Sequence, residues 1–131
     1  MYELHVEDQF SAAHNLRGYR GKCEALHGHN WKVAVSVRSN RLNRLGMVMD
    51  FADLKVALGG VIERLDHKYL NEDAKDFAPG ALNPTSENIA RVIGLALGPE
   101  MPRGVTVSRV RVWESDITSA EWTPGRGGKR R

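Results

Sequence analysis

The chain has 131 residues, 41% of them hydrophobic and 27% charged, which suits one globular domain with its own core. Its single cysteine, Cys23, excludes an internal disulfide, and no apolar run approaches the roughly 20 residues that a membrane span needs. The formal net charge of +3 owes much to basic residues near the end of the chain, so the rest carries no basic patch typical of nucleic-acid binding.

The two ends of the sequence differ in character from its middle. Glu3, Glu7 and Asp8 lie where a secretory leader would be basic and then apolar, so we expect a cytoplasmic protein. Residues 124–131 are mostly basic or glycine and cannot bury apolar surface. We therefore expect a domain over residues 1–123, followed by a disordered tail.

Two strands are predicted in the first third of the sequence. Alternating apolar residues predict a strand over residues 2–13, and valines at every second position predict another over residues 30–39. Between them, residues 14–29 form a loop rich in glycine, histidine and charge. Residues 40–46 have the composition of a basic turn.

A first helix is predicted to begin at Asp50, whose short polar side chain suits an N-cap. Its apolar residues recur at helical spacing and predict one buried face, made of Phe51, Leu54, Leu58, Val61 or Ile62, and Leu65. Gly59 and Gly60 fall in mid-helix, where each costs roughly 1 kcal/mol relative to alanine. Close packing against another element would explain them.

The remaining sequence predicts an irregular connection, a second helix and two more strands. The connection covers residues 68–84, and Pro84-Thr85-Ser86-Glu87 has the composition of a helix start. Gly98-Pro99 ends that helix. Strands follow over residues 104–114 and 117–122, and a change in the parity of the valines predicts a bulge near Ser108.

The predicted order of elements is therefore ββααββ. Two pairs of strands around a helical pair favour an α+β fold, with a four-stranded antiparallel sheet and both helices on one face. Such a sheet has two open edges, which proteins usually cover or pair. We expect pairing between subunits to close them.

The segment from Cys23 to His29, Cys-Glu-Ala-Leu-His-Gly-His, carries most of the chemistry. Residues two apart in an extended segment point the same way, so His27 and His29 can present two imidazoles to one ion. His14, at the end of the preceding strand, can supply a third. Three neutral imidazoles suit Zn²⁺ and leave one coordination position open, as in catalytic sites. For the His-x-His pair alone, two surface histidines in a turn are the alternative.

Cys23 has three interpretations. It is a fourth ligand in a closed structural zinc site, an inert buried thiol, or a reactive thiolate whose pKa is lowered by a nearby metal ion and imidazole. In the last case Asp66 and His67 would complete a Cys–His–carboxylate arrangement. A histidine near the end of a helix is also common for electrostatic reasons alone.

Three more residues, Glu114, Thr85 and Ser86, have both a structural and a functional interpretation. Glu114 ends an apolar strand, where a carboxylate is usually solvated. At the rim of a pocket it could instead hold an N–H/NH₂ pair of a heterocycle through two charge-assisted hydrogen bonds. Thr85 and Ser86 are either helix caps or pocket residues. His5 lies on the polar side of its strand and is predicted to be structural.

Six short motifs, in order over residues 3–122, resemble the 6-pyruvoyl-tetrahydropterin synthase family. They are Phe10-Ser-Ala-Ala-His14, Cys23-x3-His27-Gly-His29-Asn-Trp31, Met49-Asp-Phe51, Leu65-Asp-His67, Asn83-Pro-Thr-Ser-Glu-Asn88 and Val112-Trp-Glu114. Each alone is unspecific, but together they are specific. The three residues between Cys23 and His27 resemble the bacterial 6-carboxy-5,6,7,8-tetrahydropterin synthases of this family, which act in queuosine biosynthesis.

The resemblance implies a tunnelling fold (T-fold), in which sheets join into a barrel, trimers pair as hexamers and active sites lie between subunits. Carried over residue by residue, it implies a Zn²⁺ ion on three ligands, His14, His27 and His29. The catalytic residues it implies are the general base Cys23 and its relay, Asp66 and His67. The residues that would hold the pterin are Glu114, Thr85 and Ser86.

The implied reaction converts 7,8-dihydroneopterin triphosphate to 6-carboxy-5,6,7,8-tetrahydropterin, with loss of acetaldehyde and triphosphate. Candidates for binding the triphosphate are Arg17, Arg20, Lys22 and Lys68. A second reaction stays open, because Glu24-x-x-His27-Gly-His29 also resembles a folate-route variant that uses a glutamate and forms 6-hydroxymethyl-7,8-dihydropterin. A zinc-stabilised binding module without turnover is the alternative from another class. We expect no nucleic-acid or membrane partner.

Overall fold

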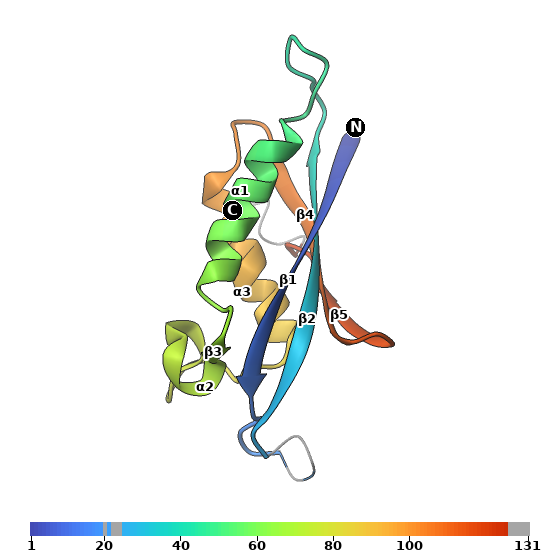
Figure 1. Cartoon of the computed structure of the whole chain (residues 1–131). Coiled ribbons are helices and arrows are strands. Elements are labelled where there is room, and N and C mark those ends of the chain that lie inside the picture. The colour runs from blue at the N-terminus through green and yellow to red at the C-terminus, as the bar shows by residue number, and fades with distance from the viewer. Residues whose placement is uncertain (20, 22–24, 126–131) are drawn as a thin grey trace.

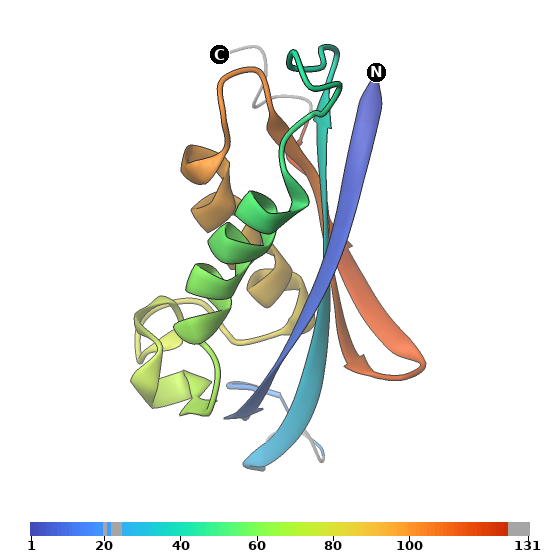
Figure 2. The ribbon, with the colours of Figure 1, turned by 45° about the horizontal axis from the view of Figure 1, so that its top comes forward.

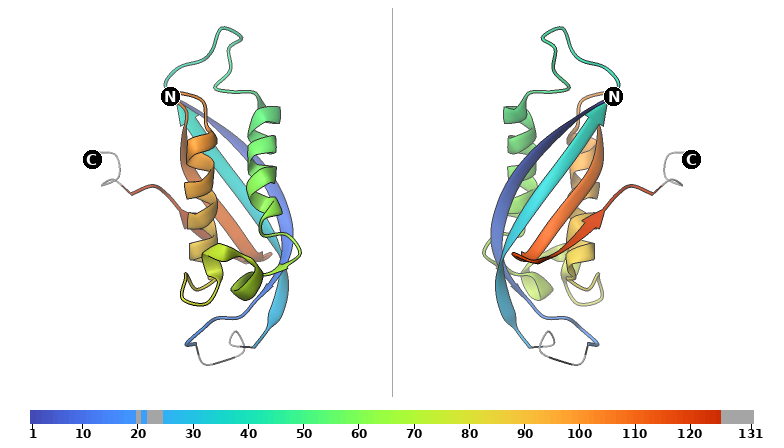
Figure 3. Two further views of the ribbon diagram at one scale, coloured as in Figure 1. Left: turned by 90° about the vertical axis from the view of Figure 1, so that its left-hand side faces the viewer. Right: turned by 90° about the vertical axis from the view of Figure 1, so that its right-hand side faces the viewer.

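The computed structural model describes residues 1–19, 21 and 25–125. A twisted sheet forms its centre, and two long helices lie side by side on one face of that sheet (Figures 1 and 3). No described helix covers the other face, which Figure 3 shows on its right. This is the α+β arrangement that the order of elements predicts.

The longest pair in the sheet is β1 (Tyr2–His14) with β2 (His27–Ser39). The two strands are antiparallel over their whole length, from Tyr2 opposite Ser39 to His14 opposite His27. β4 (Thr106–Ser115) then pairs with β2, and β5 (Thr118–Trp122) pairs with β4, both antiparallel. The predicted strands are confirmed, and β2 begins three residues earlier than residue 30, at His27.

The sheet has a fifth strand that the sequence analysis missed. The two-residue β3 (Lys68–Tyr69) runs parallel to the end of β1, so the strand order is β3-β1-β2-β4-β5 (Figure 2). The prediction of four antiparallel strands was wrong in this respect. Two residues cannot establish a period of two, so no sequence pattern marks such a strand.

The two long helices begin where the sequence predicts. α1 (Phe51–Glu63) has Asp50 as its N-cap, and the Asp50 side chain accepts a hydrogen bond from the backbone of Ala52. α3 (Ser86–Leu97) has Thr85 as its N-cap. The segment predicted as irregular instead holds β3 and the short helices α2 (Leu70–Asp73) and η2 (Lys75–Phe77), and η3 (Gly98–Glu100) follows α3.

The core lies between the helices and the sheet. Trp31, Val33, Val35 and Val37 of β2 point toward the helices and are fully buried. Leu54, Leu58, Val61, Ile62 and Leu65 cover them from α1 and the turn after it, as predicted. Phe51 does not, because it lies at the first position of α1 and 51% of its surface is exposed.

The predicted bulge lies at Ser108. Ser36 pairs with Arg109 and Val37 with Val107, so Ser108 has no partner across the ladder. In a regular strand, Val107 and Val110 would point to opposite faces because they are three residues apart. The extra residue at the bulge places both on the buried face.

The expected close packing at Gly59 and Gly60 is not found. A methyl group added at either residue would meet no described atom of another element within 4 Å. Gly94 on α3 is different, because a methyl group there would lie 2.2 Å from the Trp122 ring of β5.

Both edges of the sheet are largely unpaired within the described residues. β3 covers β1 only at Ala12 and Ala13, and β5 has β4 as its single described neighbour. None of the described helices is long and apolar enough to cross a membrane.

Candidate metal centre and active site

Three histidines come together at one end of the hairpin of β1 and β2, where β1 ends and β2 begins. His14 lies opposite His27, and His29 lies opposite Ala12, so all three side chains emerge on the helix side of the sheet. Their ring centroids are 4.5 to 5.2 Å apart, and their candidate ligand atoms all lie within 4.8 Å of one another. The predicted convergence of His14, His27 and His29 is therefore present.

Hydrogen bonds to two of the rings leave their Nε2 atoms available. His14 Nδ1 donates to the carbonyl of Pro84 at 2.7 Å, and His27 Nδ1 donates to the carbonyl of Ala25 at 2.7 Å. The two Nε2 lone pairs then face each other at 2.9 Å, and the buried Nε2 of His29 has no hydrogen-bond partner among the described residues. A metal cation bound between the rings would satisfy all three nitrogens.

Burial favours the neutral form that a metal requires. His14 is 1% exposed, and burial lowers the pKa of its imidazole below the ordinary value. Burial also lowers the pKa of His29, against the opposing effect of the Glu114 carboxylate. Neutral imidazoles are metal ligands, whereas protonated ones are not.

Glu114 is the predicted substrate residue that lies beside the histidines. It ends the apolar run of β4 on the same face as Val112, and its Oε1 is 3.6 Å from His29 Nε2. It is part-buried rather than fully solvated. A carboxylate at the rim of the histidine cluster can accept two hydrogen bonds from a bound heterocycle.

The start of α3 approaches the cluster through its backbone. Pro84 provides the carbonyl that accepts from His14, and Thr85 and Ser86 follow directly. The Thr85 hydroxyl caps α3 by accepting from the backbone of Asn88 at 3.1 Å, so the capping interpretation holds for Thr85. Ser86 is the first residue of the helix and is part-buried.

Asp66 and His67 lie together at the edge of the sheet. Asp66 Oδ1 accepts from the backbone of Ser11 at 2.9 Å and lies 3.0 Å from His67 Nδ1. The hydrogen bond from Ser11 lowers the pKa of Asp66. The His67 side chain is 82% exposed, and among the described residues no hydrogen bond or ion pair joins the Asp66–His67 pair to the three imidazoles. His67 and His29 do line the same shallow depression at the ends of β1 and β2.

Other candidates from the sequence are placed differently. Arg17 points into the fold, where its guanidinium donates to the carbonyls of Leu82, Asn71 and Phe77, so it is not free to bind a triphosphate. Lys68 is exposed on β3. His5 is structural as predicted, since its Nδ1 lies 2.7 Å from the Ser36 hydroxyl. Four candidates lie outside the described residues: Arg20, Lys22, Cys23 and Glu24.

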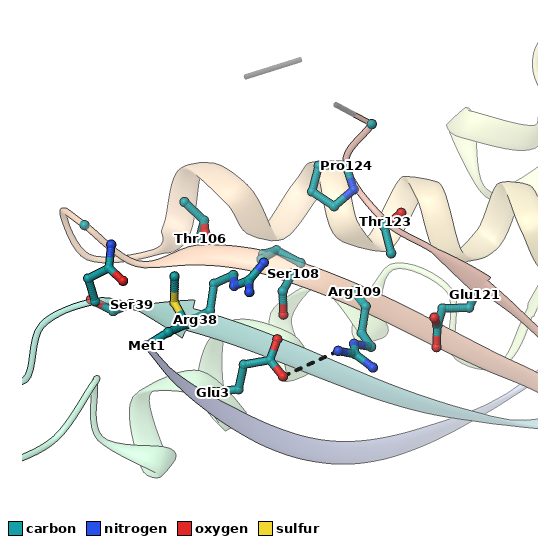
Figure 4. Close-up of a pocket in the computed structure, with 14 residues that line it drawn as sticks. Met1, Glu3, Arg38, Ser39, Thr106, Ser108, Arg109, Glu121, Thr123 and Pro124 are labelled. Carbon is teal, nitrogen blue, oxygen red and sulfur yellow. Dashed lines mark hydrogen bonds and ion pairs between the residues drawn. The ribbon is translucent and has the colours of Figure 1, made fainter. Parts of the chain in front are cut away.

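A cavity lies at the opposite end of the sheet, on the face without helices (Figure 4). It has a volume of about 830 Å³, and its charged side chains balance: Arg38 and Arg109 against Glu3 and Glu121. Glu3 and Arg109 already pair at 3.4 Å. His14 lies eleven positions after Glu3 along β1, which is roughly 37 Å along a strand. The cavity is therefore not part of the histidine site.

Comparison with known proteins identifies the family of this chain. The sequence profile described as 6-pyruvoyl tetrahydropterin synthase matches residues 3–124. A Synechocystis protein named 6-carboxy-5,6,7,8-tetrahydropterin synthase is 43% identical over 95 residues, which are 69% of this chain and 70% of that protein. A Pyrococcus furiosus protein named dihydroneopterin monophosphate aldolase is 36% identical over 112 residues, 86% of this chain and 89% of that protein.

A solved structure extends the comparison to three dimensions. The 6-pyruvoyl tetrahydropterin synthase of Caenorhabditis elegans superposes with a TM-score of 0.84 at 28% identity, covering 95% of this chain and 96% of that one. Fold, histidine cluster and sequence thus point to one class, enzymes of pterin synthesis built on the T-fold. The chain belongs to the 6-pyruvoyl tetrahydropterin synthase family.

Proposed function

We propose that the protein is a zinc-dependent 6-carboxy-5,6,7,8-tetrahydropterin synthase acting on 7,8-dihydroneopterin triphosphate in queuosine biosynthesis. The observation that carries the proposal is the convergence of three imidazoles whose Nε2 atoms share one small space. The name of the Synechocystis relative and the three-residue gap between Cys23 and His27 support the choice of product.

His14, His27 and His29 would hold the metal. Bound there, Zn²⁺ would act as a Lewis acid toward the hydroxyls on the substrate's side chain and acidify the adjacent C–H bonds. The hydrogen bonds from Nδ1 of His14 and His27 fix which nitrogen each ring presents. Glu114 would accept from the N–H and NH₂ groups of the pterin, holding the ring beside the metal.

Cys23 would be the general base that moves protons between carbon atoms of the substrate, with Asp66 and His67 as its relay. Proton transfer by a placed base is worth roughly 10²- to 10⁴-fold in rate. Over the whole reaction the C–O bond to triphosphate breaks, one C–C bond in the substituent of the pterin ring breaks, and a water molecule is consumed. Triphosphate and acetaldehyde leave, and the carboxylate remains on the tetrahydropterin.

The position of Asp66 and His67 supports an active site shared between subunits. The pair lies at an exposed sheet edge, without a described contact to the histidine cluster of its own subunit. The same edge of β1 is unpaired over most of its length within the described residues. We propose that another subunit closes this edge, in trimers that pair as hexamers.

Product analysis by mass spectrometry tests the proposal. Zinc-loaded wild type should convert dihydroneopterin triphosphate to 6-carboxytetrahydropterin and acetaldehyde. Cys23→Ala should retain zinc and lose turnover by at least 100-fold, whereas His5→Ala, which changes a histidine outside the cluster, should retain turnover. Loss of zinc from Cys23→Ala would instead identify a closed structural site in a binding module without turnover.

A second candidate is an aldolase reaction that uses Glu24. The Pyrococcus furiosus relative named dihydroneopterin monophosphate aldolase and the presence of Glu24 beside Cys23 favour it. Its product would be 6-hydroxymethyl-7,8-dihydropterin, formed by breaking the C–C bond between the first and second carbons of the side chain. The other two carbons would leave as glycolaldehyde triphosphate, and a proton would replace them on the first carbon. The same incubation separates the two reactions, because Glu24→Ala should abolish hydroxymethylpterin and leave carboxypterin formation intact.

A further inference from the structure

We infer that Arg17 and Asn83 form a clamp that positions His14 as a metal ligand through the carbonyl of Pro84. This inference rests on the proposed function only in taking the three histidines as a metal site. Neither residue touches the histidine rings in the described contacts, so both are positioning residues.

The Pro84 carbonyl decides which nitrogen His14 presents. Its oxygen accepts from His14 Nδ1 at 2.7 Å, which leaves the lone pair on Nε2 facing His27. Without this acceptor the neutral imidazole is free to carry its proton on Nε2, where it would block a metal. The orientation of one peptide group therefore controls one metal ligand.

Asn83 holds that peptide group from the preceding residue. Its Oδ1 accepts from the backbone N–H of Arg17 at 2.9 Å, and its Nδ2 donates to the carbonyl of Arg17 at 3.3 Å. Its own carbonyl accepts from Asn88 Nδ2 at 2.9 Å and from the backbone of Thr85 at 2.8 Å. Pro84 itself is buried and has a fixed φ, so the segment has little freedom to rotate.

Arg17 fixes the other side of the clamp. Its guanidinium donates to the carbonyls of Leu82 and Asn71, each at 3.1 Å, and to that of Phe77. One planar group thus connects three backbone positions of the segment between α1 and α3 to the residues that follow His14. A lysine at this position could not match this geometry, because its ammonium is a compact point charge without the planar fork of donors.

Hydrogen bonds between Asn71 and Asn15 form a second connection, closer to His14. Asn71 is 4% exposed, accepts from the backbone of Asn15 at 3.0 Å and donates to the Asn15 carbonyl at 2.8 Å. The backbone just after His14 is thus bound to the segment that carries Pro84 at two successive points, residues 15 and 17.

Metal binding to the apoprotein tests the clamp without any substrate. We expect Asn83→Ala and Arg17→Lys to bind Zn²⁺ about 10- to 100-fold more weakly than wild type, measured by competition with a chelator of known affinity. Arg109→Lys is the matched control, since Arg109 bonds the Glu3 carboxylate at the far end of the sheet, and its zinc affinity should equal that of wild type.

A second readout separates positioning from a general loss of stability. Long-range ¹H–¹⁵N correlation spectra of the metal-free protein should show His14 protonated on Nδ1 in wild type and shifted toward Nε2 in Asn83→Ala. Unchanged tautomer and unchanged zinc affinity in a folded Asn83→Ala protein would overturn the clamp, even if Arg17→Lys fails to fold. That result would leave the proposed reaction standing, whereas absence of zinc binding by wild type would overturn both.

Discussion

At the scale of single residues, the site depends on imidazoles that are neutral and correctly oriented. His14 is nearly inaccessible to solvent, and its two ring nitrogens have different partners, a peptide carbonyl and another imidazole. His29 has a buried nitrogen that no described residue satisfies. Leaving such a group unsatisfied costs roughly 1–3 kcal/mol, so the metal-free site lowers the stability of the protein that holds it.

Zinc should therefore stabilise the fold, and removal of a ligand should abolish the effect. We expect His29→Ala to bind Zn²⁺ at least 100-fold more weakly and to lose the rise in melting temperature that zinc gives to wild type. His5→Ala serves as the control, because His5 bonds Ser36 on the face without helices. An equal zinc-dependent shift in both variants would contradict the three-histidine site.

The metal-free protein should lose stability in mild acid. Burial lowers the pKa of His14 and His29 in the folded state, while in the unfolded state both titrate near 6.5. Below that pH the unfolded protein takes up protons that the folded state resists. The stability that the two neutral imidazoles contribute is thus fully present above pH 6.5. It is lost as the pH falls from there through their lowered pKa values in the folded state.

Urea denaturation of the apoprotein at pH 7.5, 6.5 and 5.5 measures this dependence. The midpoint should fall with pH in wild type and fall less in His29→Ala, which lacks one of the two groups. A midpoint that is higher at pH 5.5 than at pH 7.5 would contradict the assignment.

At the scale of elements, the contact between α3 and β5 leaves no room for a side chain at Gly94. A methyl group there would lie 2.2 Å from the Trp122 ring and would push helix and strand apart. Gly59 on α1 faces open space, so the same substitution there meets no described atom of another element. The two glycines therefore serve different purposes, although both lie inside helices.

Alanine at these two positions should change stability in opposite directions. We expect Gly94→Ala to destabilise the protein by about 1–3 kcal/mol through overpacking, and Gly59→Ala to stabilise it by about 0.5–1 kcal/mol through helix propensity. Urea denaturation of both variants gives the comparison. A stabilising effect of Gly94→Ala would show that Trp122 moves aside without cost.

At the scale of the whole molecule, the described residues place a histidine cluster that could hold a metal ion on one face of the sheet and a His–Asp pair at an exposed edge. Both sheet edges have backbone groups without a described strand partner, which favours association of copies through them. An active site assembled from two subunits follows from this arrangement under the proposed function.

Mixing two inactive variants tests the shared site. His14→Ala and His67→Ala should each lack activity alone, and mixed oligomers formed by refolding them together should recover part of it. Recovery is expected because some sites then receive an intact His14 from one subunit and an intact His67 from the next. No recovery, with mixing verified by native mass spectrometry, would place both residues in the same subunit's site.

Features that depend on local sequence patterns could be predicted, whereas very short elements and contacts between distant residues could not. The caps at Asp50 and Thr85, the valines of β2 and the bulge at Ser108 are local patterns, and the structure confirms them. The strand β3 is too short for a pattern. The partners of Arg17 lie 54 to 65 residues away, and no local rule reveals them.

The position of the histidines at the base of the hairpin has a consequence for how such enzymes diverge. His14 and His27 face each other across the last pair of the ladder, so the chain segment that joins β1 to β2 begins and ends at this pair. A metal bound there would link the last residue of β1 to the first residue of β2. Insertions or exchanges at Cys23 and Glu24 could then alter the reaction while the ligands stay in place, so new pterin chemistry would require changes in one loop only.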